Sequence, residues 1–242
     1  MEYGLQLCSV RDAMAADAKG TLKTVAEIGY SAVEFAGFYG HSAKEMARYT
    51  DRAGLRISGA HIPYTDLLPD AIEKTLAYHR ELGNTRLIIP TYDASTPEKL
   101  EAFVRSMKEW QERLGEAGFT LGYHNHHTAF LPVGGEGLRA FDKLWNRTDI
   151  FFQIDTYWAY VAGEDPVALL REKKDRIPVI HLKDGDLLHR GYSLGLGTAP
   201  VRAIHDTAVS LGMEIVVESE TQNPTGPEEV ARCMAYLKSL VK

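Results

Sequence analysis

The chain alternates two kinds of segment eight times along its 242 residues. Each unit has a short apolar run with β-branched or aromatic residues, followed by a longer segment whose apolar residues lie three or four positions apart. Short apolar runs bounded by turn residues predict buried strands, and the wider spacing predicts amphipathic helices. The expected strands are residues 3–8, 32–35, 56–61, 85–90, 119–125, 150–155, 178–182 and 213–218.

The residues between these segments indicate where helices begin and end. Residues 95–98 (Ser-Thr-Pro-Glu) and 164–166 (Glu-Asp-Pro) are typical helix starts, and the glycines at 83, 118 and 212 are typical helix ends. Eight strand-helix units fit a (β/α)8 TIM barrel of roughly 250 residues better than an open doubly wound sheet. The absence of a P-loop, and of GxGxxG after the first strand, also disfavours the common nucleotide-binding folds. We therefore expect an α/β protein with a single TIM barrel domain over residues 1–242.

Composition excludes several classes of partner. The net charge is −6 with no long basic run, which argues against a nucleic-acid surface. The two cysteines, Cys8 and Cys233, form no CxxC pair, so a disulfide framework or a thiolate metal site is not expected. No leader-like start and no apolar run of roughly 20 residues is present, so we expect a cytoplasmic protein without a membrane partner. The sequence leaves the oligomeric state open, a homo-oligomer included.

Polar residues gather where six of the expected strands end. The densest group is Tyr-His-Asn-His-His at 123–127, at the end of the fifth strand. In a TIM barrel the functional residues lie at the carboxyl ends of the strands, so these side chains are expected to meet at one mouth. Carboxylates and neutral imidazoles in such a group suit Mn, Mg, Co or Zn. The residues are Glu34, His61, His124, His126, Asp155, His181, Lys183, Glu218 and Glu220.

Several of these strand ends together resemble a known family. They are Gly-Ala-His-Ile-Pro (59–63), Tyr-His-Asn-His (123–126), Ile-Asp-Thr-Tyr-Trp (154–158), Asp-Pro-Val-Ala-Leu-Leu (165–170), Arg-Ile-Pro-Val-Ile-His-Leu-Lys-Asp (176–184) and Val-Val-Glu-Ser-Glu (216–220). In order and spacing they are similar to the xylose-isomerase-like TIM barrel superfamily. Within it they most resemble the sugar phosphate isomerase/epimerase family, in the subgroup that carries His-Asn-His after the fifth strand.

The resemblance implies a divalent metal and a small-molecule sugar, keto-sugar or polyol as substrate. It assigns Asp155, His181 and Glu218 as metal ligands, with His124 as the fourth. The chain departs from the family pattern at His124, where many epimerases carry a catalytic glutamate. It departs again at Trp158, where sugar epimerases often carry a substrate-contacting histidine, and at residues 127–130 (His-Thr-Ala-Phe), which lack the glutamate common in the subgroup.

The expected reaction is isomerisation or epimerisation by removal of a proton next to a carbonyl. Glu218 is the expected base, and the family's second base must be replaced by another group. The candidates for that second catalytic group are His126, Glu220, Lys183 and Glu34. Substrate contacts are expected from Glu34, His61, Trp158 and Lys183.

Other functions stay open at this point. A metal-dependent lyase or dehydratase acting on a keto-sugar or keto-glycoside needs one base and one acid, and the same residues suit it. A non-catalytic sugar-binding barrel would explain the missing glutamate as decay. An endonuclease IV-like nuclease shares the barrel, but the acidic charge of the chain argues against it.

Overall fold

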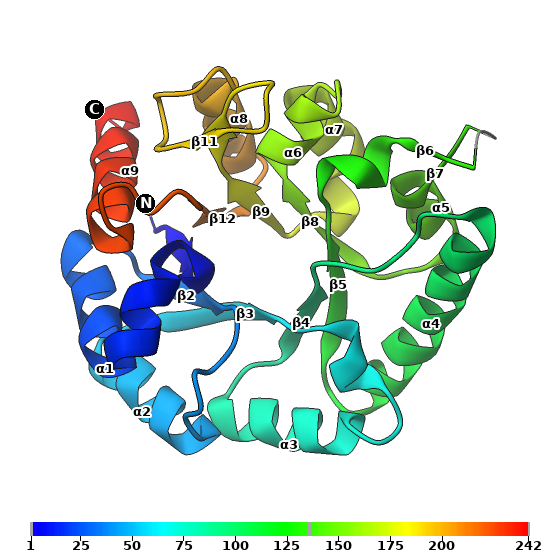
Figure 1. Ribbon diagram of the computed structural model, residues 1–242, viewed down its shortest axis with the longest axis horizontal. Helices are drawn as coiled ribbons and strands as arrows, with labels where there is room; N and C mark the ends of the chain where they lie inside the picture. The colour runs from blue at the N-terminus through cyan, green and yellow to red at the C-terminus, as the bar shows by residue number, and fades with distance from the viewer. Residues whose placement is uncertain (1, 135–136, 242) are drawn as a thin grey trace.

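Eight parallel strands close into a barrel in the computed structural model, which describes residues 2–134 and 137–241 (Figure 1). The strands follow one another around the barrel in sequence order, and β1 pairs with both β2 and β12 to close it. They are β1 (Gly4–Gln6), β2 (Ala32–Phe35), β3 (Arg56–His61), β4 (Arg86–Ile89), β5 (Thr120–His124), β8 (Phe151–Asp155), β9 (Val179–Leu182) and β12 (Glu214–Val217).

Helices cover the outside of the barrel, and α1 packs beside α9 where the two ends of the chain meet (Figure 1). The helices are α1 (Arg11–Ile28), α2 (Ala43–Arg52), α3 (Ile72–Leu82), α4 (Pro97–Glu116), α5 (Ala140–Arg147), α6 (Thr156–Val161), α7 (Pro166–Lys173), α8 (Val201–Ser210) and α9 (Gly226–Leu240). The described residues also form four short 3-10 helices: η1 (Leu7–Val10), which precedes α1, η2 (Tyr64–Leu67), η3 (His127–Phe130) and η4 (Lys174–Arg176). No helix in the described part of the chain is both long enough and apolar enough to cross a bilayer.

The observed strands confirm the predicted TIM barrel. Each expected strand overlaps one strand of the barrel, and the ends agree within two residues. β1 stops at Gln6 because the next four residues turn into η1. Two small hairpins were not predicted: β6 (Pro132–Val133) with β7 (Leu138–Arg139), and β10 (Asp184–Gly185) with β11 (Gly191–Tyr192). The expected domain ends, residues 1 and 242, lie outside the described residues.

The helices begin and end at capping residues that can be recognised in the sequence. Thr96 caps α4 by accepting a hydrogen bond from the Lys99 amide, and Pro97 occupies the first turn. Gly83 ends α3 in the left-handed region at φ 82°, where a side chain would be strained. At the amino end of the barrel, Arg86 of β4 contacts Glu214 of β12 at 2.7 Å. Contacts at the amino end of a TIM barrel stabilise the fold, and the functional residues are expected at the carboxyl end.

Acid is expected to destabilise the barrel through His79. The imidazole is 2 % exposed on α3 and accepts a hydrogen bond from Asn84, and burial lowers its pKa to about 4. An unfolded histidine titrates near 6.5, so the unfolded chain binds the proton first as pH falls. Stability present above pH 6.5 is therefore lost as pH falls towards 4, by on the order of 3 kcal/mol.

Urea unfolding of the wild type and His79→Gln across this pH range measures that loss. The difference in stability between the two proteins at neutral pH reports packing and the hydrogen bond from Asn84, and not protonation, since His79 is neutral there. Between pH 6.5 and 4 the wild type should lose more stability than the variant. Parallel pH profiles would contradict the assignment.

Candidate metal centre and active site

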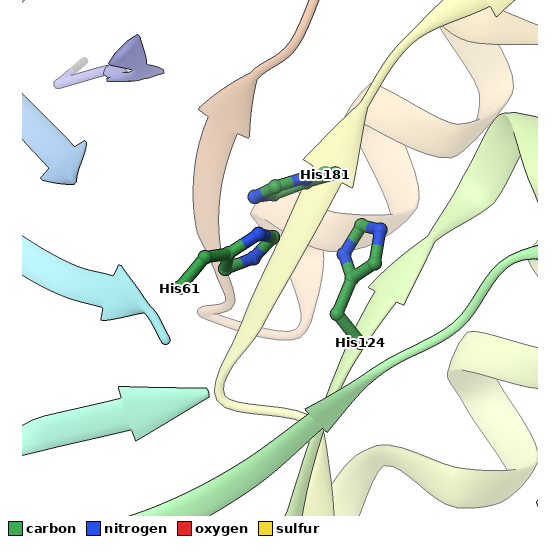
Figure 2. Close-up of side chains that lie close together, drawn as sticks. All are labelled: His61, His124 and His181. Carbon is green, nitrogen blue, oxygen red and sulfur yellow. The ribbon is translucent and has the colours of Figure 1, made fainter. Parts of the chain in front are cut away.

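Three histidines from different strands converge at the carboxyl mouth of the barrel. His61 ends β3, His124 ends β5 and His181 lies in β9. Their ring centroids lie 4.8 Å apart from His61 to His124, 4.8 Å from His124 to His181 and 5.2 Å from His61 to His181. Figure 2 shows the three rings facing one another inside the mouth. The sequence predicted this meeting, since each residue stands at or near the end of a strand.

Four buried residues form a candidate metal centre: His124, Asp155, His181 and Glu218. One possible ligand atom from each lies within 4.8 Å of the others. Asp155 ends β8, and Glu218 directly follows β12, so both carboxylates are presented at the same mouth as the imidazoles. Two nitrogen and two carboxylate donors suit a divalent ion such as Mn²⁺, Co²⁺ or Zn²⁺.

Asp155 shows that this set fits a cation. Its Oδ1 accepts a hydrogen bond from the Trp158 amide at 2.8 Å and so caps α6. Its Oδ2 is buried and has no hydrogen-bond partner among the described residues. Burial raises the pKa of Asp155 to about 7. A buried carboxylate oxygen without a partner is costly, and a bound cation would remove that cost.

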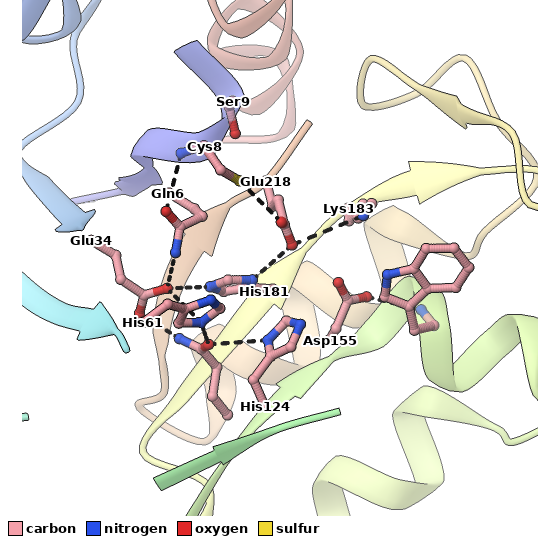
Figure 3. Close-up of polar contacts among 12 residues, drawn as sticks. Gln6, Cys8, Ser9, Glu34, His61, His124, Asp155, His181, Lys183 and Glu218 are labelled. Carbon is pink, nitrogen blue, oxygen red and sulfur yellow. Dashed lines mark hydrogen bonds and ion pairs between the residues drawn. The ribbon is translucent and has the colours of Figure 1, made fainter. Parts of the chain in front are cut away.

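Two carboxylates hold His181 from opposite sides. Its Nε2 lies 2.7 Å from Glu34 Oε1, and its Nδ1 lies 2.9 Å from Glu218 Oε2 (Figure 3). Burial opposes the charged imidazole, but the two carboxylates outweigh it and raise its pKa to about 10. A cation bound at Nδ1 would take the place of that proton, while Glu34 would keep its hold on Nε2. A carboxylate behind a ligating histidine is a common support in metal sites.

Gln153 fixes the orientation of the other two rings. Its Oε1 lies 2.7 Å from His61 Nε2 and 3.1 Å from His124 Nδ1, and its amide nitrogen donates to Glu34 Oε2 at 2.5 Å. Because an amide oxygen only accepts, both ring nitrogens must donate. Burial lowers the pKa of His124 well below its usual value, so the ring is neutral and its Nε2 carries a free lone pair. His124 is thereby prepared as a ligand.

Glu34 lies beneath the histidines of this cluster and has no exposed surface. It is fully buried, and its oxygens accept from Gln6, Gln153 and His181. Burial opposes its ionisation, but the nearby His181 and His61 lower its pKa. The sequence suggested Glu34 as a substrate contact or a second base. In the structure, both oxygens are already engaged below the cluster, so Glu34 orients His181 instead.

Lys183 places a buried positive charge beside the cluster. Its Nζ lies 2.7 Å from Glu220, 4.0 Å from Glu218 and 4.9 Å from the centre of the Trp158 ring. Burial opposes the charge, but Glu218, Asp155 and Glu220 raise the pKa of Lys183, so it stays protonated. Lys183 in turn contributes most among the charges that hold the pKa of Glu218 well below its usual value against burial.

His126 and Trp158 border the cluster on the solvent side. The His126 ring is half-buried, 5.1 Å from the His124 ring and 6.0 Å from the Trp158 ring. Burial lowers its pKa, which keeps it neutral near pH 7. Both residues line a cavity of about 370 Å³ beside the cluster. The structure thus brings together every predicted site residue, with Glu34 below and Glu220 at the partly exposed rim.

Sequence reasoning missed three polar residues that support the site. Gln6 and Gln153 are fully buried and donate to opposite oxygens of Glu34. The Cys8 thiol lies 3.2 Å from Glu218 Oε1 and donates to it. Gln153 had a readable signal, because it lies two positions before Asp155 on the same strand and so faces the same side. Cys8 follows β1 in η1, whose turn was not predicted.

Comparison with known proteins agrees with this fold. Residues 22–240 match the family model described as xylose isomerase-like TIM barrel. The chain belongs to this family. The resemblance of the strand-end motifs to the xylose-isomerase-like barrels is therefore confirmed.

The individual proteins and structures that the chain resembles have low sequence identity to it. The chain is 26% identical over 190 residues to the rhizopine catabolism protein MocC of Rhizobium meliloti, covering 69% of this chain and 58% of that protein. It is 26% identical over 181 residues to an inosose dehydratase of Lacticaseibacillus casei, covering 64% and 59%. The chain thus spans about three-fifths of the length of these relatives. A solved sugar phosphate isomerase/epimerase from Parabacteroides distasonis has a TM-score of 0.88 at 24% identity, covering 100% of this chain and 99% of that chain, which shows a shared fold.

Proposed function

We propose that the protein is a divalent-metal-dependent lyase that eliminates water or an alcohol from a keto-polyol or keto-sugar. The observation that carries the proposal is the asymmetry of the cluster. Glu218 brings a carboxylate from one side, whereas β5 on the other side brings His124. An elimination needs one carbon base and a proton for the leaving group, which this arrangement can supply. The similarity to inosose dehydratases points the same way.

His124, Asp155, His181 and Glu218 would hold the metal. A divalent ion there would polarise the substrate carbonyl and stabilise the negative charge that develops when the neighbouring proton leaves. His61, 2.7 Å from Gln153 and stacked at 5.2 Å on His181, would border the bound substrate.

Glu218 would remove the proton. Lys183 and His181 keep it ionised against burial, and among the described residues its Oε1 has only the weak Cys8 thiol as a donor. Oε1 is therefore the more basic oxygen, since Oε2 already faces His181 at 2.9 Å. The proton from the carbon next to the carbonyl would pass to Oε1.

Lys183 would donate a proton to the leaving oxygen. It is protonated and 1 % exposed, so its charge acts in a region with little water to screen it. A departing hydroxide or alkoxide is more basic than a lysine amine, so transfer of a proton from Lys183 is favourable. Glu220 contacts Lys183 at 2.7 Å and is partly exposed, which gives a route for a proton to return from solvent.

An epimerase needs a second carbon base across the substrate from Glu218. Glu34 is enclosed below the cluster, and Glu220 is paired with Lys183 on the Glu218 side. His124 donates through Nδ1 and offers Nε2 to the metal set. The neutral His126 is the group left for that role, and the experiment below separates the two reactions.

The test is incubation of the Mn²⁺-loaded protein with a keto-inositol in deuterated water. We expect loss of one water by mass spectrometry and a new unsaturated-ketone absorbance. Glu218→Gln should lower kcat by at least about 100-fold, since it removes the carbon base. Deuterium in a recovered, epimerised ketone without water loss would instead assign the isomerase/epimerase reaction.

A further inference from the structure

Three consecutive residues after β12 are each held by a side chain from the turn that follows β1. The pairs are Cys8 Sγ with Glu218 Oε1 at 3.2 Å, Ser9 Oγ with the Ser219 amide at 3.0 Å, and Arg11 Nη2 with the Glu220 backbone oxygen at 3.2 Å. We call the side chains of Cys8, Ser9 and Arg11 the clamp. Figure 3 shows its first two members beside Glu218. The clamp joins the first and last strands of the barrel, β1 and β12, and holds the segment that carries the proposed carbon base.

Arg11 connects the two sides of the clamp through neutral oxygens. Its Nη1 donates to the Cys8 backbone oxygen at 3.1 Å, while its Nη2 donates to that of Glu220. The Gln222 amide, turned with its oxygen towards Arg11, accepts from Nε at 3.1 Å and from Nη2 at 2.9 Å. A planar guanidinium can serve three acceptors in a fixed geometry. None of these acceptors is charged, so the contacts of Arg11 fix positions and do not compensate a charge.

The contact with Cys8 fixes the direction of its thiol. Gln6 caps η1 by accepting from the Cys8 amide at 3.1 Å, and Arg11 holds the Cys8 oxygen. Both backbone polar groups of Cys8 are thus engaged while its thiol reaches Glu218 Oε1. Because Oε1 is the oxygen that would receive the proton, a shift of this turn would move the hydrogen-bond donor of the carbon base.

The contact with Glu220 supports the partner of the proposed proton donor. The Glu220 side chain is 44% exposed, so packing alone does not hold it, yet its carboxylate lies 2.7 Å from Lys183 Nζ. Arg11 holds the backbone from which Glu220 reaches Lys183. The next residue but one, Gln222, has a φ of 49°, a strained conformation for a residue other than glycine. This strained segment therefore depends on contacts such as those of Arg11.

We propose that Arg11 is a positioning residue, which aligns Glu218 and Lys183 for proton transfer by joining η1 to the segment after β12. The inference rests on the proposed lyase function. In the described chain the hydrogen bonds of Arg11 go to no residue of the metal set, and Glu218 Oε2 stays in contact with His181 without them. Loss of Arg11 should therefore lower kcat far more than it changes KM or the affinity for Mn²⁺.

Arg11→Ala tests the proposal, with Arg232→Ala as the matched control. Both arginines are exposed and both hold the loop after β12, but Arg232 donates to Ser193 and Asn223, outside residues 218–220. With a keto-inositol as probe, Arg11→Ala should lower kcat at least about tenfold, with KM and Mn²⁺ affinity within about threefold of the wild type. Because Arg11 is exposed, guanidinium ion added below denaturing concentrations should restore part of the lost kcat. Arg232→Ala should show neither the loss nor the rescue.

Alkylation of Cys8 gives a second readout that does not need turnover. Cys8 is half-buried, whereas Cys233 is fully buried and serves as the internal reference. Iodoacetamide labelling followed by mass spectrometry of the cysteine peptides measures both rates. Arg11→Ala should raise the rate at Cys8 at least about fivefold, because a turn released at one backbone oxygen opens more often. The rate at Cys233, and both rates in Arg232→Ala, should stay as in the wild type.

The outcomes separate the positioning role from the chemistry. Equal kcat in Arg11→Ala and Arg232→Ala overturns the positioning role while the lyase stands, and so does a loss of kcat that guanidinium does not restore. If the wild type eliminates no water from the keto-inositol, the proposed function fails by itself and the labelling rates decide. Faster labelling of Cys8 in Arg11→Ala than in Arg232→Ala then keeps the clamp, and equal labelling overturns it.

Discussion

Asp155→Asn is expected to remove metal binding and activity and to leave the barrel at least as stable. The amide keeps the oxygen that accepts from the Trp158 amide and caps α6. It removes a fully buried negative charge whose second oxygen has no hydrogen-bond partner in the described chain. Burial of such a charge is costly, so its loss relieves strain in the metal-free protein. A metal bound there would supply several kcal/mol of charge stabilisation, so turnover should fall by at least about 100-fold.

The measurement is thermal unfolding with and without Mn²⁺, together with metal titration by calorimetry. The wild type should unfold at a higher temperature when Mn²⁺ is added, because a ligand that binds the folded state stabilises it. Asp155→Asn should lose that rise and keep the metal-free transition. Full metal content and full turnover in the variant would show that Asp155 is not a ligand.

Asp184→Asn is the matched control, since Asp184 is equally buried at the neighbouring strand end but serves structure. Its oxygens accept from four backbone amides, those of Gly185, Gly195, Gly197 and Ala199. An amide NH₂ placed against these donors loses hydrogen bonds, so this variant should unfold at lower temperature. It should retain the rise on adding Mn²⁺. The same substitution thus gives opposite results at two buried aspartates.

The barrel was predictable because its signals are local. Each strand is an apolar run, and caps such as Thr96 and stops such as Gly83 mark the helices between them. The hairpins β6–β7 and β10–β11 were not predictable, because each of their strands is only two residues long. Runs that short carry no periodicity.

The sequence predicted which residues meet at the mouth of the barrel, but not which of them are buried below the cluster. The fold rule places strand-end residues such as Asp155 and Glu218 at one mouth. The rule does not say which of these side chains faces solvent. Glu34 ends up below the cluster because Gln6 and Gln153, from strands far apart in sequence, both reach its oxygens. Hydrogen bonds between residues 119 positions apart leave no trace in local pattern.

Gln153→Met is expected to loosen the metal centre without touching a ligand. The substitution preserves the size and shape of the side chain but leaves Glu34 Oε2 and His124 Nδ1 without their Gln153 partner, whereas His61 Nε2 keeps its contact with Glu34 Oε1 at 3.1 Å. Each lost buried hydrogen bond costs roughly 1–3 kcal/mol, so stability should fall measurably. His124 is then free to carry its proton on Nε2, which removes the lone pair that faces the cluster. Affinity for Mn²⁺ should fall by about 10- to 100-fold.

Nitrogen-15 NMR of the imidazoles measures the His124 tautomer, whose change is the expected cause of the lower Mn²⁺ affinity. In the metal-free wild type His124 should carry its proton on Nδ1, and Gln153→Met should show a mixture or the Nε2–H form. The other buried glutamine gives the control. Gln6 donates to Glu34 Oε1 at 2.6 Å and accepts from the Cys8 amide, and neither bond involves a histidine. Gln6→Met should therefore cost similar stability while His124 keeps its tautomer and the protein keeps its Mn²⁺ affinity. Equal loss of affinity in both variants would mean that Gln153 acts only through stability, because Gln6 cannot orient His124.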